Sequence, residues 1–90
     1  MPDSYRILII DDEPRMCESL SKLLGEQGYQ VSSANTAEQG MQLLAQSAFD
    51  LLLLDIVLPD MNGLEVLEYV HANYADLLVI MFSGGKRFVQ

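Results

Sequence analysis

Ile7-Leu8-Ile9-Ile10-Asp11-Asp12-Glu13-Pro14 decides the fold of this 90-residue chain. Four consecutive aliphatic residues without polar alternation are typical of a strand that is buried on both faces of a parallel sheet. Two acids end the run, and the proline suits the first turn of a helix, where its missing N–H costs no hydrogen bond. The stretch therefore predicts a buried strand, an acidic turn and a helix in close succession.

Three further strand signals and two further helix signals follow. A weaker strand around Val31 precedes Thr36 and Gln39, which fit a capping box that opens a second helix. Residues 51–54 predict a third strand, and the apolar stretch 77–82 predicts a fourth. The first helix is expected to stop around Gly25 and Gly28. The residues expected on the inward faces of the three helices are Met16, Leu20, Leu23 and Leu24, then Met41, Leu44 and Ala45, then Val66, Leu67, Val70 and Tyr74.

Alternating strands and helices with short connections predict a doubly wound α/β layer built on a parallel sheet. Half of the residues are hydrophobic and 20% are charged, so the chain can bury enough apolar surface to fold. No linker or internal repeat interrupts the pattern. We therefore expect one domain over residues 1–90.

Composition excludes several classes of partner. A formal net charge of −8, from 13 acidic and 5 basic residues, opposes direct binding to nucleic acid or to an anionic membrane. The single cysteine, Cys17, lies in an apolar helical pattern, which predicts a buried thiol in a reducing compartment. The N-terminus carries an acid and only four aliphatic residues follow it, too few for a signal peptide or a membrane span. The expected location is the cytoplasm.

Polar side chains follow three of the predicted strands. Asp11 and Asp12 close the first strand, Asp55 the third and Ser83 the fourth. In parallel sheets ligands bind beyond the carboxyl ends of the strands, so these side chains should meet. Three carboxylates in one crevice repel each other unless a cation is present, and Mg²⁺ prefers such oxygen ligands. The pattern predicts a magnesium site in which Asp55 attacks a phosphoryl group and Ser83 hydrogen-bonds to it.

Structural alternatives stand beside these roles. Asp12 is equally well explained as a helix N-cap, and Ser83 taken singly is more often a turn residue. Glu13 is interpreted as a favourable charge near a helix start rather than as a metal ligand. His71 is expected to be an exposed or half-buried helix residue, because no second ligand lies at helical spacing from it.

These residues resemble the receiver domain of two-component response regulators. The matching motifs are the stretch quoted above, Leu54-Asp55-Ile56-Val57-Leu58-Pro59-Asp60-Met61-Asn62-Gly63, and Met81-Phe82-Ser83-Gly84. The resemblance implies a flavodoxin-like fold of five strand–helix units and a sensor histidine kinase or phosphotransfer protein as partner. It implies that Asp12 ligates Mg²⁺ directly and Asp11 through water. It also implies that Asp55 is both ligand and phosphoacceptor, that Val57 offers its backbone carbonyl, and that Ser83 is the switch hydroxyl.

The resemblance stops before the family's fourth helix, fifth strand and fifth helix. The family's phosphate-binding lysine lies on the fifth strand, so Lys86 comes too early and is expected to be a solvated loop charge. We therefore expect a receiver that is incomplete at its C-terminus, with any covalently linked output domain outside this chain. The exposed fourth strand predicts a homodimer or strand exchange.

The expected function is a signalling switch that catalyses only its own phosphorylation and dephosphorylation, not an enzyme of metabolism. An alternative is a remnant that keeps the acids as an interaction module without switching. An aspartyl-phosphate phosphatase of the haloacid dehalogenase type would need Asp-x-Asp, whereas Ile56 and Val57 follow Asp55. A flavin- or nucleotide-binding module would need a glycine- or hydroxyl-rich loop where this chain has acids.

Overall fold

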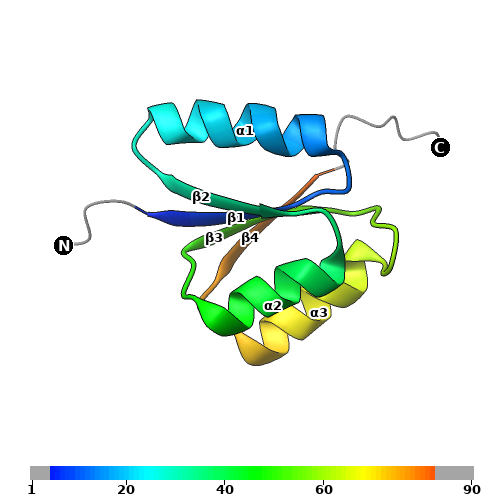
Figure 1. Ribbon diagram of the computed structural model, residues 1–90. Helices are drawn as coiled ribbons and strands as arrows, with labels where there is room; N and C mark the ends of the chain where they lie inside the picture. The colour runs from blue at the N-terminus through cyan, green and yellow to red at the C-terminus, as the bar shows by residue number, and fades with distance from the viewer. Residues whose placement is uncertain (1–4, 83–90) are drawn as a thin grey trace.

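Strands and helices alternate along the chain in the predicted order. The structure, a computed structural model, describes residues 5–82. The elements are β1 (Arg6–Ile10), α1 (Pro14–Glu26), β2 (Gln30–Ala34), α2 (Ala37–Gln46), β3 (Leu51–Asp55), α3 (Gly63–Asn73) and β4 (Leu78–Phe82). Figure 1 shows the strands as one layer, with α1 on one face and α2 and α3 on the other.

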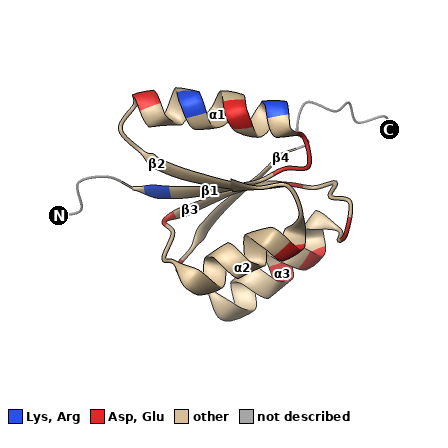
Figure 2. Cartoon of the chain, viewed as in Figure 1, with Lys and Arg blue, Asp and Glu red and all other residues tan. Residues whose placement is uncertain are grey.

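The sheet is parallel, with the strand order β2-β1-β3-β4. The chain first adds β2 on one side of β1 and then crosses to add β3 on the other, so the switch point lies between β1 and β3. Ile10 is paired with Leu54 in register, which places the residues that follow these two strands at the same edge. The strands are almost uncharged, and Figure 2 shows the charges mainly on the helices and in the loops. The doubly wound α/β prediction is confirmed.

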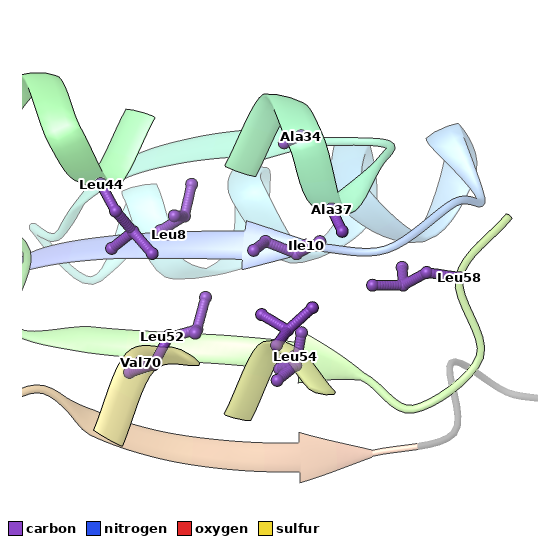
Figure 3. Packing of buried hydrophobic residues seen from close by; sticks show 10 residues of the cluster. Leu8, Ile10, Ala34, Ala37, Leu44, Leu52, Leu54, Leu58 and Val70 are labelled. Atoms are coloured by element: carbon purple, nitrogen blue, oxygen red, sulfur yellow. The ribbon is translucent and has the colours of Figure 1, made fainter. Parts of the chain in front are cut away.

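The core has one cluster on each face of the sheet, because successive residues of a strand point to opposite faces. The α1 face buries Ile7, Ile9 and Cys17. The face covered by α2 and α3 holds the larger cluster, most of which Figure 3 labels. Its buried members are Leu8, Ile10, Ala34, Ala37, Leu44, Leu52, Leu54, Leu58, Val66 and Val70.

Two of the residues predicted to face inward do not. Leu23 is 56% exposed, because α1 packs through Cys17 with Leu20 and Leu24, and Leu23 lies off that stripe. Ala45 is also exposed. Helix α2 packs instead through Ala37, Leu44 and Gly40, and a Cβ atom at Gly40 would overlap the side chain of Ile10. The glycine lets α2 approach β1 closely, and Ala45 lies off the stripe through which the helix packs.

The end of α1 only partly follows the prediction. The helix continues through Gly25 and ends at Glu26. Gly28 has a φ of 97°, in the left-handed region that glycine adopts without steric cost. The chain therefore turns away from α1 at Gly28, and Gly25 is an ordinary residue of the helix.

Within residues 5–82, β4 pairs with β3 alone. Its Leu78 and Ile80 side chains are 64% and 50% exposed. Self-association through this strand stays a prediction. Ser83 and Lys86 lie outside the described residues. Among the residues that are described, no helix has the length and apolar character needed to cross a membrane.

Candidate functional site

Three acidic side chains converge beyond the carboxyl ends of β1 and β3. One carboxylate oxygen from each of Asp11, Asp12 and Asp55 lies within 4.8 Å of the others. Asp11 and Asp55 are fully buried, and Asp12 is half-buried. The three carboxylates therefore meet beyond the carboxyl ends of the strands, as the sequence predicted.

Each of the two buried carboxylates accepts a hydrogen bond from its own loop. The Glu13 N–H donates to Asp11 Oδ1 (3.0 Å), and the Val57 N–H donates to Asp55 Oδ1 (3.1 Å). The other oxygen of Asp11, Oδ2, is buried and accepts no hydrogen bond from any residue in the range 5–82. A buried carboxylate oxygen in this state carries a substantial desolvation cost.

The electrostatics of the cluster favour a cation. Burial raises the pKa of Asp11 from its ordinary 3.8 to about 6. The Glu13 N–H opposes the rise in pKa, whereas the neighbouring Asp55 and Asp12 carboxylates add to it. A hard divalent ion, which takes oxygen ligands and keeps several waters, offsets the repulsion between carboxylates that lie this close together. The donor set and the buried Oδ2 of Asp11 both fit Mg²⁺.

The backbone of Asp11 is held from behind by β2 and α1. Its N–H donates to the Ala34 carbonyl (3.0 Å), and its own carbonyl accepts from Asn35 Nδ2 (2.9 Å) and the Cys17 thiol (3.4 Å). Burial raises the pKa of the Cys17 thiol, which favours the protonated form that can donate. The prediction that Cys17 is buried is confirmed. Asn35 was missed, although it too follows a strand at this edge of the sheet.

The loop 56–62, between β3 and α3, is closed at its neck. Gly63 donates its N–H to the Ile56 carbonyl (2.8 Å), and Val57 forms an isolated antiparallel bridge with Asn62. A Cβ atom on Gly63 would lie 2.6–2.7 Å from backbone atoms of Asp55 and Ile56, so only glycine fits without a shift. Asn62 also forms a capping box at the start of α3. The start of α3 is thus pressed against the backbone that carries the acids.

The far end of this loop is attached to α2 by Asp60. Its two carboxylate oxygens accept the N–H groups of Ala37 (2.9 Å) and Glu38 (3.0 Å). These hydrogen bonds hold the pKa of Asp60 below its ordinary value. Sequence reasoning missed this contact, because it joins a loop to the start of a helix 23 positions away without any periodic pattern.

The structure also distinguishes the alternative roles considered above. Asp12 is not the N-cap of α1, because Glu13 occupies that position without a side-chain cap. Glu13 lies outside the acidic cluster, and His71 is an exposed residue of α3. Val57 lies in the loop directly after Asp55. Ser83 falls outside the described residues, so its place at the site remains a prediction.

This fold and this cluster are those of a response regulator receiver domain. Residues 7–88 match the family described by that name, and the chain belongs to it. It is a receiver domain of the two-component systems.

Relatives agree with this assignment. The chain is 34% identical over 82 residues to the transcriptional activator protein PfeR of Pseudomonas aeruginosa, covering 91% of this chain and 27% of PfeR. A crystal structure of the response regulator TrrA from Thermotoga maritima, in complex with Mg²⁺-BeF, is 35% identical with a TM-score of 0.82. That match covers 86% of this chain and 67% of the other.

A second structure contains TrrA together with the histidine kinase ThkA. It is 31% identical with a TM-score of 0.84, and the match covers 96% of this chain and 74% of that chain. The chain spans about a third or less of the length of such curated relatives. It covers 27% of PfeR and 35% of the regulatory protein DltR of Streptococcus agalactiae. The activities of those whole proteins therefore belong with the proposals below.

Proposed function

We propose that this domain is a phosphorylation-dependent switch in which Asp55 accepts a phosphoryl group. The observation that carries the proposal is the convergence of Asp11, Asp12 and Asp55 at the switch point, with two of the three carboxylates fully buried. Carboxylates this close together, two of them buried, repel one another, and a cation among them offsets that repulsion.

The proposed ligands of Mg²⁺ are Asp12, Asp55 and the backbone carbonyl of Val57, with Asp11 acting through a water molecule. The ion supplies positive charge that offsets the repulsion among the acids and stabilises the transferring phosphoryl oxygens. The Val57 N–H holds one Asp55 oxygen in a fixed direction, and the Glu13 N–H does the same for Asp11. The chain thereby presents preoriented carboxylates, which lowers the entropy cost of the reaction.

The phosphoryl transfer balances as a displacement at phosphorus. A carboxylate oxygen of Asp55 forms an O–P bond while the bond between phosphorus and the donor's histidine nitrogen breaks, and the nitrogen keeps the electron pair. The same attack on acetyl phosphate releases acetate. We propose that Ser83 donates a hydrogen bond to a phosphoryl oxygen of the product. The domain acts on its own phosphoryl group and on no metabolite.

The relatives support the partners of this reaction. TrrA, which resembles this chain, has been crystallised with a histidine kinase, and a sensor kinase or phosphotransfer protein is the proposed donor here. PfeR is named as a transcriptional activator, and the chain covers only part of it. We propose that an output segment elsewhere in the protein reads the switch, because the net charge of −8 opposes direct DNA binding by this segment.

Phosphorylation by acetyl phosphate with Mg²⁺, followed by mass spectrometry, tests the proposal. The wild-type chain should gain one phosphoryl group that is stable in acid and labile in base, as an acyl phosphate is. Asp55→Asn should gain none. Asp50→Asn is the matched control, because Asp50 is exposed at the other end of β3 and the charge change is the same. Modification that persists in Asp55→Asn would place the acceptor elsewhere. Mg²⁺ binding without any modification of the wild-type chain would favour the non-switching remnant.

A further inference from the structure

We infer that Asp60 is a positioning residue for the acidic site, because it ties the loop that carries Val57 to the first turn of α2. The inference rests on the proposed function only in taking Mg²⁺ binding as its readout. Asp60 itself lies outside the cluster of three acids and touches neither Asp11 nor Asp55 through any hydrogen bond found in residues 5–82. Its effect on the site must pass through the loop.

The loop 56–62 is fixed at three separate points. At its neck, Gly63 is hydrogen-bonded to Ile56 and Val57 is bridged to Asn62. In its middle, Leu58 is 9% exposed and belongs to the core cluster, and Figure 3 shows its side chain pointing toward Ile10 and Ala37. At its far end, Asp60 is bonded to α2. Removing the last of these points frees the segment that follows Val57.

The first turn of α2 is completed by this contact. A helix leaves its first N–H groups without partners inside the helix. Thr36 Oγ1 accepts the N–H of Gln39, while Asp60 accepts those of Ala37 and Glu38. A carboxylate is favoured at this place because the N-terminus of a helix is partly positive. One side chain from a distant loop thus completes the capping of this turn.

Asp60 has both a structural and a positioning effect, and the two can be separated by comparison at equal global stability. Water can replace its carboxylate on the exposed Glu38 N–H, whereas the N–H of the buried Ala37 would lose its partner. Substitution should therefore also destabilise the fold, as the loss of a helix cap does. Water cannot hold the loop in place. The Val57 N–H reaches Asp55 Oδ1 at 3.1 Å, so a displaced loop would weaken that bond and disturb the proposed ligand carbonyl of the same residue.

Asp50 provides a matched control. Its Oδ2 accepts the N–H of Arg6 at 2.8 Å, across 44 positions, and it is exposed like Asp60. This contact lies at the amino end of the sheet, away from the acids. Asp60→Ala and Asp50→Ala therefore remove the same charge and the same kind of contact at opposite ends of β3.

The first experiment is a Mg²⁺ titration of the chain followed by NMR. We expect about fivefold weaker binding in Asp60→Ala, less than the roughly tenfold or greater loss that follows removal of a residue hydrogen-bonded to a metal ligand, because Asp60 acts only through the loop. Asp60→Asn keeps one acceptor and should fall between Asp60→Ala and the wild type. Asp50→Ala should bind within about twofold of the wild type, a margin equivalent to a few tenths of a kcal/mol. Equal affinities in Asp60→Ala and Asp50→Ala would overturn the inference.

The second experiment measures amide exchange of Val57 without metal, so it does not depend on the proposed function. Asp60→Ala should lose protection at Val57, whereas Asp50→Ala should keep it once exchange is compared at equal global stability. A wild-type chain that binds no Mg²⁺ would refute the proposed metal site, and the Val57 exchange would still decide the role of Asp60. Unchanged protection of Val57 in Asp60→Ala would refute the positioning role.

Discussion

The two ends of the sheet use the same residue types in opposite ways. At the amino end, the acid Asp50 accepts a backbone N–H, and the guanidinium of Arg6 lies 5.2 Å from the centre of the Phe49 ring. At the carboxyl end, Asp11 is buried beside two other acids and its pKa is raised to about 6. The amino end places its acid on a backbone N–H, whereas the carboxyl end gathers three acids at the proposed metal site. Stability is thus assigned mainly to one end of the strands and the proposed binding to the other.

The largest effect is expected from two glycines, one at each end. Gly63→Ala places a Cβ atom against the backbone of Asp55 and Ile56 and should cost about 3 kcal/mol, because backbone must move to accommodate it. Gly28→Ala meets no atom within 4 Å but is strained at a φ of 97°, which should cost about 1 kcal/mol. Urea unfolding measures both values. Equal losses would mean that the close approach at the carboxyl end is relieved by a shift of α3.

A smaller effect is expected from pH, through Asp11. Its raised pKa means that the folded state holds this proton more tightly than the unfolded state. The resulting stabilisation is complete below about pH 4 and is lost as the pH rises through about 6. Without metal, we expect the wild-type chain to lose about 1 kcal/mol relative to Asp11→Asn over this range, after allowance for solvent screening.

Saturating Mg²⁺ should offset this loss above about pH 6 in the wild type, because the ion binds the deprotonated acids. Urea unfolding of both chains at about pH 4 and about pH 7, with chelator or with Mg²⁺, supplies the comparison. A stability difference between them that is independent of pH without metal would show that Asp11 does not titrate in this window.

The smallest effect is expected at the amino end. A double-mutant cycle of Arg6→Met and Phe49→Leu should give a coupling of about 0.5 kcal/mol, as for an exposed cation over an aromatic ring. Neither substitution should change the affinity for Mg²⁺. A change in that affinity would show that the two ends are linked through β1 and β3, so that they do not act independently.

The sequence predicted those features that leave a local pattern of residues and missed those that do not. The acids Asp11, Asp12 and Asp55 were found because a strand end is visible in the sequence and parallel strands share an edge. The Asp60 contact with α2 was not found, because a loop and a helix start that meet in space share no sequence spacing. Helix faces were predicted well except for Leu23 and Ala45, which lie off the stripes through which α1 and α2 pack. The predicted role of Ser83 concerns a residue outside the described part of the chain.

The central pair of strands has a kinetic consequence. β1 and β3 are neighbours in the sheet, but α1, β2 and α2 lie between them in the sequence. Asp11 and Asp55 therefore meet only after a long loop has closed. Long-range parallel pairing is slow, because loop closure costs entropy before contacts compensate for it. A cation that needs both acids gains its full affinity only once this pairing exists. If the pairing completes after the folding barrier, Mg²⁺ should slow unfolding and leave the folding rate nearly unchanged.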